Sequence, residues 1–115
     1  RTQIDNENAI MDIEKSENLQ IPESFSLAQN YPNPFNPSTK IEFSVSEIAN
    51  INLEIFDILG KNIQTVVDKS MDPGFYKFNI SMDGFASGMY FYRLVAINQS
   101  GSIIHNQMRK MILMR

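Results

Sequence analysis

Residues 41–67 have the sequence IEFSVSEIANINLEIFDILGKNIQTVV, and this stretch decides the fold. Apolar side chains occupy every second position in residues 41–45 and again in residues 51–55. Such an alternation is typical of a strand that buries one face. After the second run, the sequence DILGK contains Gly60, which can adopt a positive φ in a turn. We therefore predict a hairpin over residues 51–67.

The pattern of strands and turns continues toward the end of the chain. Residues 75–80 alternate again, after a Pro-Gly pair at 73–74 that predicts a type II turn. Residues 89–97 are apolar on both sides except for one arginine, which is typical of a central strand. Residues 103–114 are the predicted closing strand, which we expect to be broken near Asn106.

These segments give six strands, and residues 25–31 add a seventh if they pair. No helical pattern follows residue 24. The combination predicts an all-β fold, an immunoglobulin-like antiparallel β-sandwich of about seven strands. The residues expected inside it are Ile41, Phe43, Leu53, Ile55, Phe78, Ile80, Tyr90 and Leu94.

Length and composition suit one small folded domain. The chain has 115 residues, a hydrophobic fraction of 43% and a net charge of −3, which gives no reason to expect a nucleic-acid partner. Cysteine is absent, so disulfides and thiolate metal sites are excluded. The longest apolar run is far short of the roughly 20 residues that span a bilayer.

The first 24 residues differ from the rest. They carry six acidic and two basic residues without a strong period, which predicts an acidic linker; an amphipathic turn around residues 9–13 is the alternative. The chain begins without methionine and without a basic start followed by an apolar stretch. We therefore expect a fragment of a longer protein, with the linker at 1–24 and the domain at 25–115.

Residues 31–38, YPNPFNPS, hold three of the five prolines and are called the proline loop below. Each proline fixes its own φ and holds the preceding residue extended. The side chains of Asn33 and Asn36 can accept hydrogen bonds from nearby amides. Tyr31 and Phe35 are expected to pack against the end of the sandwich. A rigid corner explains the loop on physical grounds alone.

Five segments, in order, resemble the C-terminal sorting domain of the type IX secretion system of Bacteroidetes. They are FSLAQNYPNPFNPSTKIEF at 25–43, IFDILGK at 55–61, PGFY at 73–76, ASGMYFYRL at 86–94 and KMILM at 110–114. The resemblance implies a sorting signal and not an enzyme, with no cofactor. It also implies that an outer-membrane translocon recognises the domain and that a sortase-like peptidase removes it, most simply within the linker. The upstream cargo would pass through the periplasm and be released or anchored at the cell surface.

The residues that carry the resemblance are the expected recognition residues. They are Tyr31, Pro32, Asn33, Pro34, Phe35, Asn36, Pro37, Gly60, Gly74, Gly88, Tyr90, Arg109 and Lys110. A second interpretation applies to the basic residues Arg109, Lys110 and Arg115. Basic side chains on a solvent-exposed edge strand protect that strand from aggregation. With the resemblance, we favour a docking strip in which apolar residues 111–114 contact a receptor and the bases set its orientation.

Other chemistry has little support in the sequence. His105 is the only histidine, so a Ser-His pair or a multi-histidine metal site has no partner within the chain, and we expect an exposed strand residue. The aspartates match no EF-hand spacing and are better explained as turn formers; they are Asp57, Asp68, Asp72 and Asp83.

Two further classes of function stay open. An immunoglobulin-like stalk or adhesion module would need only the fold. A carbohydrate-binding module would need an exposed aromatic platform, for which Tyr76, Tyr90 and Tyr92 are the candidates. At strand spacing these tyrosines are more often part of the core.

Overall fold

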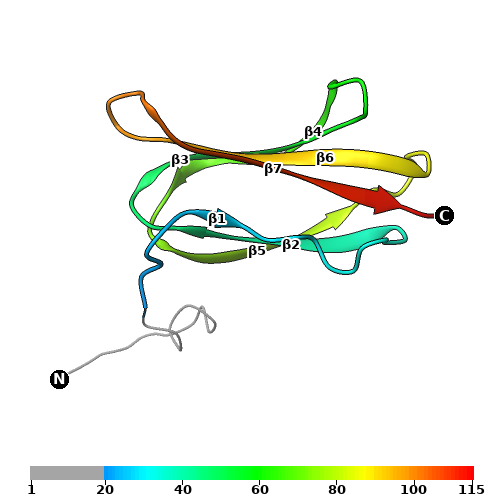
Figure 1. Ribbon diagram of the computed structural model, residues 1–115, viewed down its shortest axis with the longest axis horizontal. Coiled ribbons are helices and arrows are strands. Elements are labelled where there is room, and N and C mark those ends of the chain that lie inside the picture. Colours follow the sequence, from blue (N-terminus) through cyan, green and yellow to red (C-terminus); the bar gives the residue numbers. More distant parts are fainter. Residues whose placement is uncertain (1–19) are drawn as a thin grey trace.

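The computed structural model describes residues 20–115, so the predicted linker at 1–24 lies mostly outside the described residues. The described part forms two antiparallel sheets that pack face to face (Figure 1). It contains no helix that could span a membrane. Its strands are β1 (Ser26–Leu27), β2 (Ser38–Val45), β3 (Ala49–Phe56), β4 (Asn62–Met71), β5 (Gly74–Ser81), β6 (Gly88–Ile97) and β7 (Ile103–Leu113).

The strand order is that of an immunoglobulin-like sandwich. One sheet has the order β1-β2-β5 and the other the order β4-β3-β6-β7. β6 lies between β3 and β7, as predicted for a central strand. The predicted fold class is therefore confirmed, and so is the hairpin, which β3 and β4 form.

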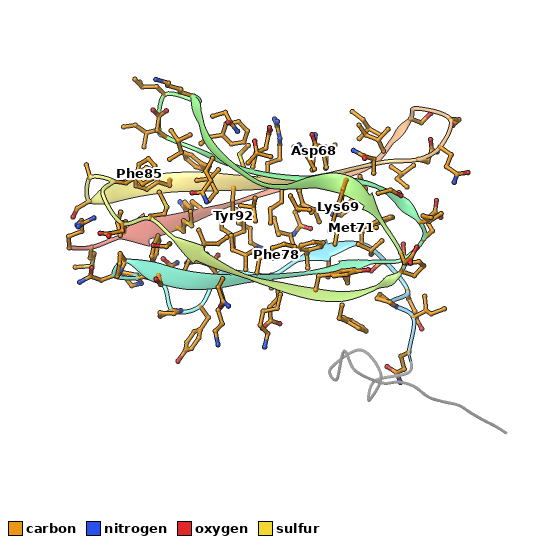
Figure 2. All side chains as sticks on the ribbon, turned by 180° about the vertical axis from the view of Figure 1, so that it is seen from behind. Asp68, Lys69, Met71, Phe78, Phe85 and Tyr92 are labelled. Atoms are coloured by element: carbon orange, nitrogen blue, oxygen red, sulfur yellow. The ribbon has the colours of Figure 1, made fainter. Side chains whose placement is uncertain are left out.

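The core lies between the sheets and is built from alternate residues of β2, β3 and β6. Seven of the eight residues predicted inside are buried; the exception, Phe78, is only partly buried. Phe78 lies on edge strand β5, where one flank of the side chain has no neighbouring strand, and its ring stacks on Phe43 at 5.8 Å between centroids. Figure 2 shows Phe78 and Tyr92 between the two layers.

The β3–β4 turn follows the local chemistry of its residues. Gly60 has a φ of +86°, a backbone conformation that is unfavourable for residues with a side chain. The carboxylate oxygen Oδ1 of Asp57 accepts hydrogen bonds from the amides of Leu59 at 2.9 Å and Lys61 at 3.0 Å. Asp57 is thus a turn former, as predicted.

The predicted type II turn at 73–74 is wrong. Such a turn needs a positive φ at its glycine, and Gly74 is not one of the glycines with that conformation. Gly74 instead begins β5, is buried, and pairs with Val45 of β2. The two residues between β4 and β5 carry the chain from one sheet to the other, and this crossing overrides the local preference for a turn.

Two strand boundaries also differ from the prediction. β7 runs without a break through Asn106, and its irregularity lies earlier, where Ala96 pairs with His105 but Ile97 pairs with Ile103. The extra residue is a β-bulge. The segment predicted at 25–31 forms only the two-residue strand β1, with one isolated bridge farther along.

Candidate functional site

The proline loop and the end of β7 lie together at one end of the sandwich (Figure 1). Phe35 forms an isolated parallel bridge with Leu113. Its amide donates to the carbonyl of Ile112 at 3.0 Å, and its carbonyl accepts from the amide of Met114 at 2.9 Å. The side-chain oxygen of Asn33 accepts from the amide of Ile112 at 3.0 Å. The first motif of the domain is thus hydrogen-bonded to its last.

The loop's aromatic residues have opposite environments. Phe35 is 2% exposed and belongs to the core cluster, as predicted. Tyr31 is 78% exposed, so its predicted packing against the sandwich is wrong. It forms a bridge to Lys40 of β2 with its side chain in solvent.

The asparagines and prolines also depart from the simple prediction. Asn33 accepts from an amide 79 positions away and not from a nearby one. Asn36 is exposed, and no hydrogen bond of its side chain occurs in the described part of the chain. The peptide bonds that precede Pro32, Pro34 and Pro37 are all cis, a conformation that the motif alone does not indicate.

A buried polar network holds the start of the loop. The hydroxyl of Tyr92, in the centre of β6, donates to the carbonyl of Ala28 and accepts from the amide of Asn30, both at 2.7 Å. The side-chain amide of Asn30 donates to Pro32 O at 3.1 Å and to Thr39 Oγ1 at 3.0 Å. Burial raises the pKa of Tyr92 above its ordinary value of 10.0, and the Asn30 hydrogen bond and the Arg109 charge oppose this only in part.

Replacing Tyr92 by phenylalanine is expected to lower the free energy of unfolding at neutral pH by about 1–3 kcal/mol, because the buried amide of Asn30 and the carbonyl of Ala28 lose their hydrogen-bond partner. A raised folded-state pKa adds stability below pH 10.0, and this contribution is lost as the pH rises toward the folded value. The difference in free energy of unfolding between the wild type and Tyr92→Phe should therefore become smaller above pH 10.0. Urea denaturation at a series of pH values measures this difference. A difference that does not change with pH would contradict a stabilising role for the protonated Tyr92 hydroxyl.

The bases of β7 do not form one strip. Arg109 Nε donates to the carbonyl of Leu27 at 2.6 Å, and the side chain of Gln107 bonds to both the amide and the carbonyl of Leu27. These contacts close the seam between β1 and β7. Lys110 is exposed and pairs across the strand with Phe91 of β6. Neighbouring residues on a strand point to opposite faces, which separates the two bases.

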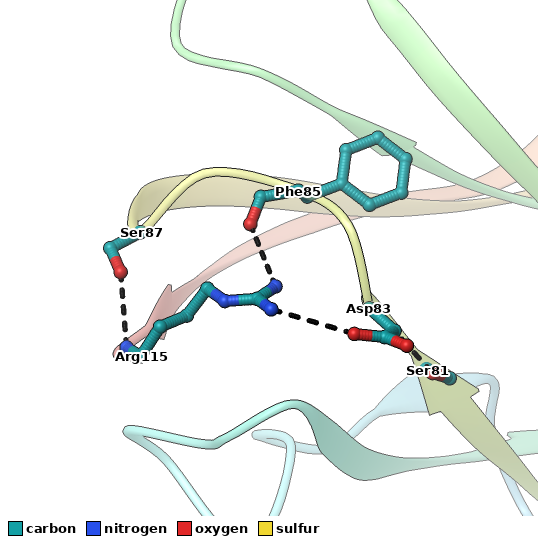
Figure 3. A network of polar contacts seen from close by, with 5 residues as sticks. All are labelled: Ser81, Asp83, Phe85, Ser87 and Arg115. Atoms are coloured by element: carbon teal, nitrogen blue, oxygen red, sulfur yellow. Dashed lines mark hydrogen bonds and ion pairs between the residues drawn. The ribbon is translucent and has the colours of Figure 1, made fainter.

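The third base, Arg115, points toward the β5–β6 connection (Figure 3). Its guanidinium donates to the carbonyl of Phe85 at 3.0 Å and pairs with Asp83 at 3.5 Å. Its backbone amide donates to the hydroxyl of Ser87 at 3.0 Å. The three bases therefore do not share one surface, and the expected docking strip stays a prediction.

The remaining predicted recognition residues divide in two groups. Gly88 pairs with Leu113, and Tyr90 pairs with Met111, so both lie beside the end of β7. Tyr90 is buried and its hydroxyl donates to the carbonyl of Ala86 at 2.6 Å. Gly60 lies in the β3–β4 turn, and Gly74 lies where β2 ends, so neither reaches the proline loop.

Residues 29–112 match the family described as the secretion system C-terminal sorting domain. The chain belongs to this family. The resemblance to the type IX sorting domains is confirmed. The family consists of sorting signals and not of catalysts, and it implies a secreted protein that crosses the outer membrane and interacts with the type IX machinery.

A solved structure from another bacterial protein shares the fold of this sorting domain. Dimeric latent PorU from Porphyromonas gingivalis is similar with a TM-score of 0.59 and 20% identity over 78% of this chain. The match covers 9% of that protein, so the sorting domain spans a small part of its length. CopC from Methylosinus trichosporium OB3b is less similar, with a TM-score of 0.47 and 15% identity over 78% of this chain and 93% of that chain. No curated protein matches the chain.

The end of the sorting domain presents a shallow hollow of about 410 Å³ between the proline loop and the end of β7. We call this the loop–strand surface. It is lined by Pro32, Pro34, Phe35, Asn36, Met114 and Arg115.

The sorting domain gives little support to metal or sugar chemistry. Residues 20–115 contain no group of acidic, histidine or cysteine side chains that could hold a metal ion. His105 is half-buried and stacks on Phe25 at 5.7 Å, so its expected exposure is wrong. Tyr90 and Tyr92 are buried and Tyr76 stacks on Phe43, so these tyrosines do not form an exposed platform.

Proposed function

We propose that residues 25–115 direct an upstream cargo domain through the type IX translocon, and that the loop–strand surface is recognised in this process. The observation that carries the proposal is the hydrogen bonding of the proline loop to residues 112–114, because it joins two separate family motifs in one surface. We further propose that residues 1–24 are the linker in which a sortase-like peptidase cuts. The cargo is then released or anchored at the cell surface, and the domain itself has no catalytic role.

The loop–strand surface suits recognition because it is rigid yet exposes apolar groups. Phe35 and the Tyr92 network hold the loop from below. Met114 lines the hollow and is exposed, and Tyr31, which precedes the lining residue Pro32 in the chain, is exposed as well. A surface that is ordered before binding loses less conformational entropy in the complex.

Fusion of residues 1–115 to the C-terminus of a periplasmic reporter is expected to send the reporter across the outer membrane of a host with type IX machinery. Tyr31→Ser should lower export about tenfold, since exposed tyrosines are frequent hot spots of interfaces. It should leave the melting temperature almost unchanged, because the side chain is in solvent. Reporter activity in the medium and in the periplasm measures both effects.

Phe75→Ser is the matched control. Phe75 is an exposed aromatic residue that pairs with Ser44, near the end of β2 that lies away from the proline loop. Equal export of the Tyr31 and Phe75 variants would mean that recognition uses another surface. Retention of the intact fusion in the periplasm would instead favour a stalk module.

A further inference from the structure

A second surface lies on the outer side of the four-stranded sheet, where β6 and β7 expose apolar side chains. Tyr90 and Tyr92 of β6 belong to the core, so Phe91 between them points outward. Cross-strand partners lie on the same face of a sheet, and the outward residue Arg93 pairs with Met108 of β7. Met108 is 52% exposed. We call the outward side of β6 and β7 the outer face.

The outer face is more apolar than the outside of a sandwich usually is. Outward-facing residues of sandwich strands are commonly polar. Those of β6 are apolar except for Arg93; they are Met89, Phe91, Val95 and Ile97. The sequence of β6 predicts a strand with both faces covered, yet within residues 20–115 only its inner face packs against a second sheet. A contiguous apolar face of this kind is typical of an interaction site.

The β3–β4 turn projects beside the outer face, on the side away from the three-stranded sheet (Figure 1). At its tip, Ile58 is 67% exposed and Leu59 is 88% exposed. The turn and the outer face enclose a hollow of about 240 Å³, which we call the outer hollow, and Phe91 and Met108 line it. One surface therefore carries both an apolar projection and an apolar hollow.

A surface with both a projection and a hollow can pair with a second copy of itself. A two-fold symmetric dimer uses the same patch on both copies, so this patch must supply both halves of every contact. A two-fold axis that runs between the β3–β4 turn and the side chains of Phe91 and Met108 lays the turn of each copy on the hollow of the other. The shape of the surface therefore favours a second copy as the occupant.

The charges of this surface also complement each other. Asp57 lies in the turn and lines the outer hollow, and Lys110 is the exposed cross-strand partner of Phe91. When the turn of one copy packs on Phe91 of the other, its Asp57 comes close to Lys110 of the second copy. The reverse pair forms by symmetry. Glu54 and Arg93 already pair within one copy at 3.4 Å. A uniformly acidic or uniformly basic partner would instead meet like charges here.

The area of the surface is sufficient for a weak dimer. Strands advance about 3.3 Å per residue and lie roughly 4.8 Å apart, so a sheet of four strands with ten residues in β6 measures about 33 Å by 15 Å. Two such faces together cover on the order of 1,000 Å², which is the lower limit for a specific interface. Association that depends on protein concentration is therefore expected.

We infer that the outer face is the interface of a two-fold symmetric dimer of this chain. Ile58 and Leu59 of each copy pack on Phe91 and Met108 of the other copy. None of the residues that line the outer hollow also lines the loop–strand surface. The inference therefore does not rest on the proposed function.

Sedimentation equilibrium of the purified chain, from micromolar to millimolar concentration, tests the inference. The average mass is expected to rise from that of one chain toward that of two. Leu59→Asp and Met108→Lys should each weaken association at least about tenfold, because a charged group would be buried against apolar side chains. Phe75→Asp is the matched control, since Phe75 is an exposed apolar residue of the three-stranded sheet, and it should leave the association unchanged.

An equal mixture of Leu59→Asp and Met108→Lys tests the symmetry of the contact. In a mixed dimer, one turn and one hollow are both wild type, and the two introduced charges have opposite signs and face each other. The mixture should therefore associate about tenfold more tightly than either variant alone. A single-chain mass at every concentration, wild-type association of both variants, or a mixture no tighter than its components would each overturn the inference.

Both substituted side chains are exposed in one copy, so the variants should melt near the wild-type temperature. Leu59→Ser or Met108→Ser replaces a variant that does not melt cooperatively. Because no secretion host is involved, a negative result here leaves the export experiment unaffected.

Discussion

Phe35→Ala is expected to lower the free energy of unfolding by about 3–5 kcal/mol, the usual effect of removing a buried phenylalanine from a core. Phe35 is almost fully buried, although it lies in a loop, and it is the side chain through which the proline loop enters the core. Small domains have a total stability of about 5–15 kcal/mol, so the loss is a large fraction of the whole. Urea denaturation followed by circular dichroism measures it.

Phe75→Ala serves as the comparison, since Phe75 is 45% exposed and contributes far less apolar contact. The backbone hydrogen bonds of residue 35 involve no side-chain atoms, so they are available to alanine as well. The difference between the two variants therefore measures the packing of the Phe35 ring. A Phe35→Ala protein as stable as Phe75→Ala would show that the loop is held by its hydrogen bonds alone.

Deletion of residues 110–115 is expected to abolish both export and cooperative unfolding. The deletion removes Met111 and Leu113, which are fully buried, together with every β7 partner of the proline loop. Loss of each large core side chain costs about 2–5 kcal/mol, so the sum approaches the stability of a small domain. Thermal melting and the reporter assay measure the two effects. A truncated chain that melts cooperatively near the wild-type temperature would contradict the role given to β7.

Single substitutions at the bases separate binding from folding. Lys110→Ala should change stability by no more than about 0.5 kcal/mol, because the side chain is exposed. Arg109→Ala is unsuitable for this purpose, since Arg109 Nε bonds to Leu27 across the β1–β7 seam. Export of Lys110→Ala at the wild-type level would exclude this base from recognition by the machinery.

The strands and most of the core were predictable because burial of one face leaves a period of two in the sequence. Ile41, Leu53 and Leu94 were identified in this way and are fully buried. Periodicity does not show which strands lie at the edge of a sheet, so Phe78 was predicted to be buried although it is only partly buried. The Pro73-Gly74 prediction was wrong because the crossing between sheets is a property of the whole fold.

The two segments of the candidate site were predicted from the sequence, but their contact with each other was not. The proline loop and residues 110–114 were both identified, but their pairing joins Asn33 to Ile112, and no local pattern encodes so distant a contact. The separation of Arg109 from Lys110 could have been predicted from strand alternation. The polar residue Asn30, beside an otherwise regular motif, is one sequence signal of the buried network below the loop.

The pairing of Phe35 with residues 112–114 has a consequence for unfinished proteins. A polypeptide that ends before Ile112, through early termination or proteolysis, has no strand end for Asn33 and Phe35 to bind. Its proline loop would lack those partners, and the surface shared by loop and strand would not exist. If the export machinery recognises the loop–strand surface as proposed, a cargo would therefore be competent for export only once residues 112–114 have been synthesised, and shorter fragments would be retained.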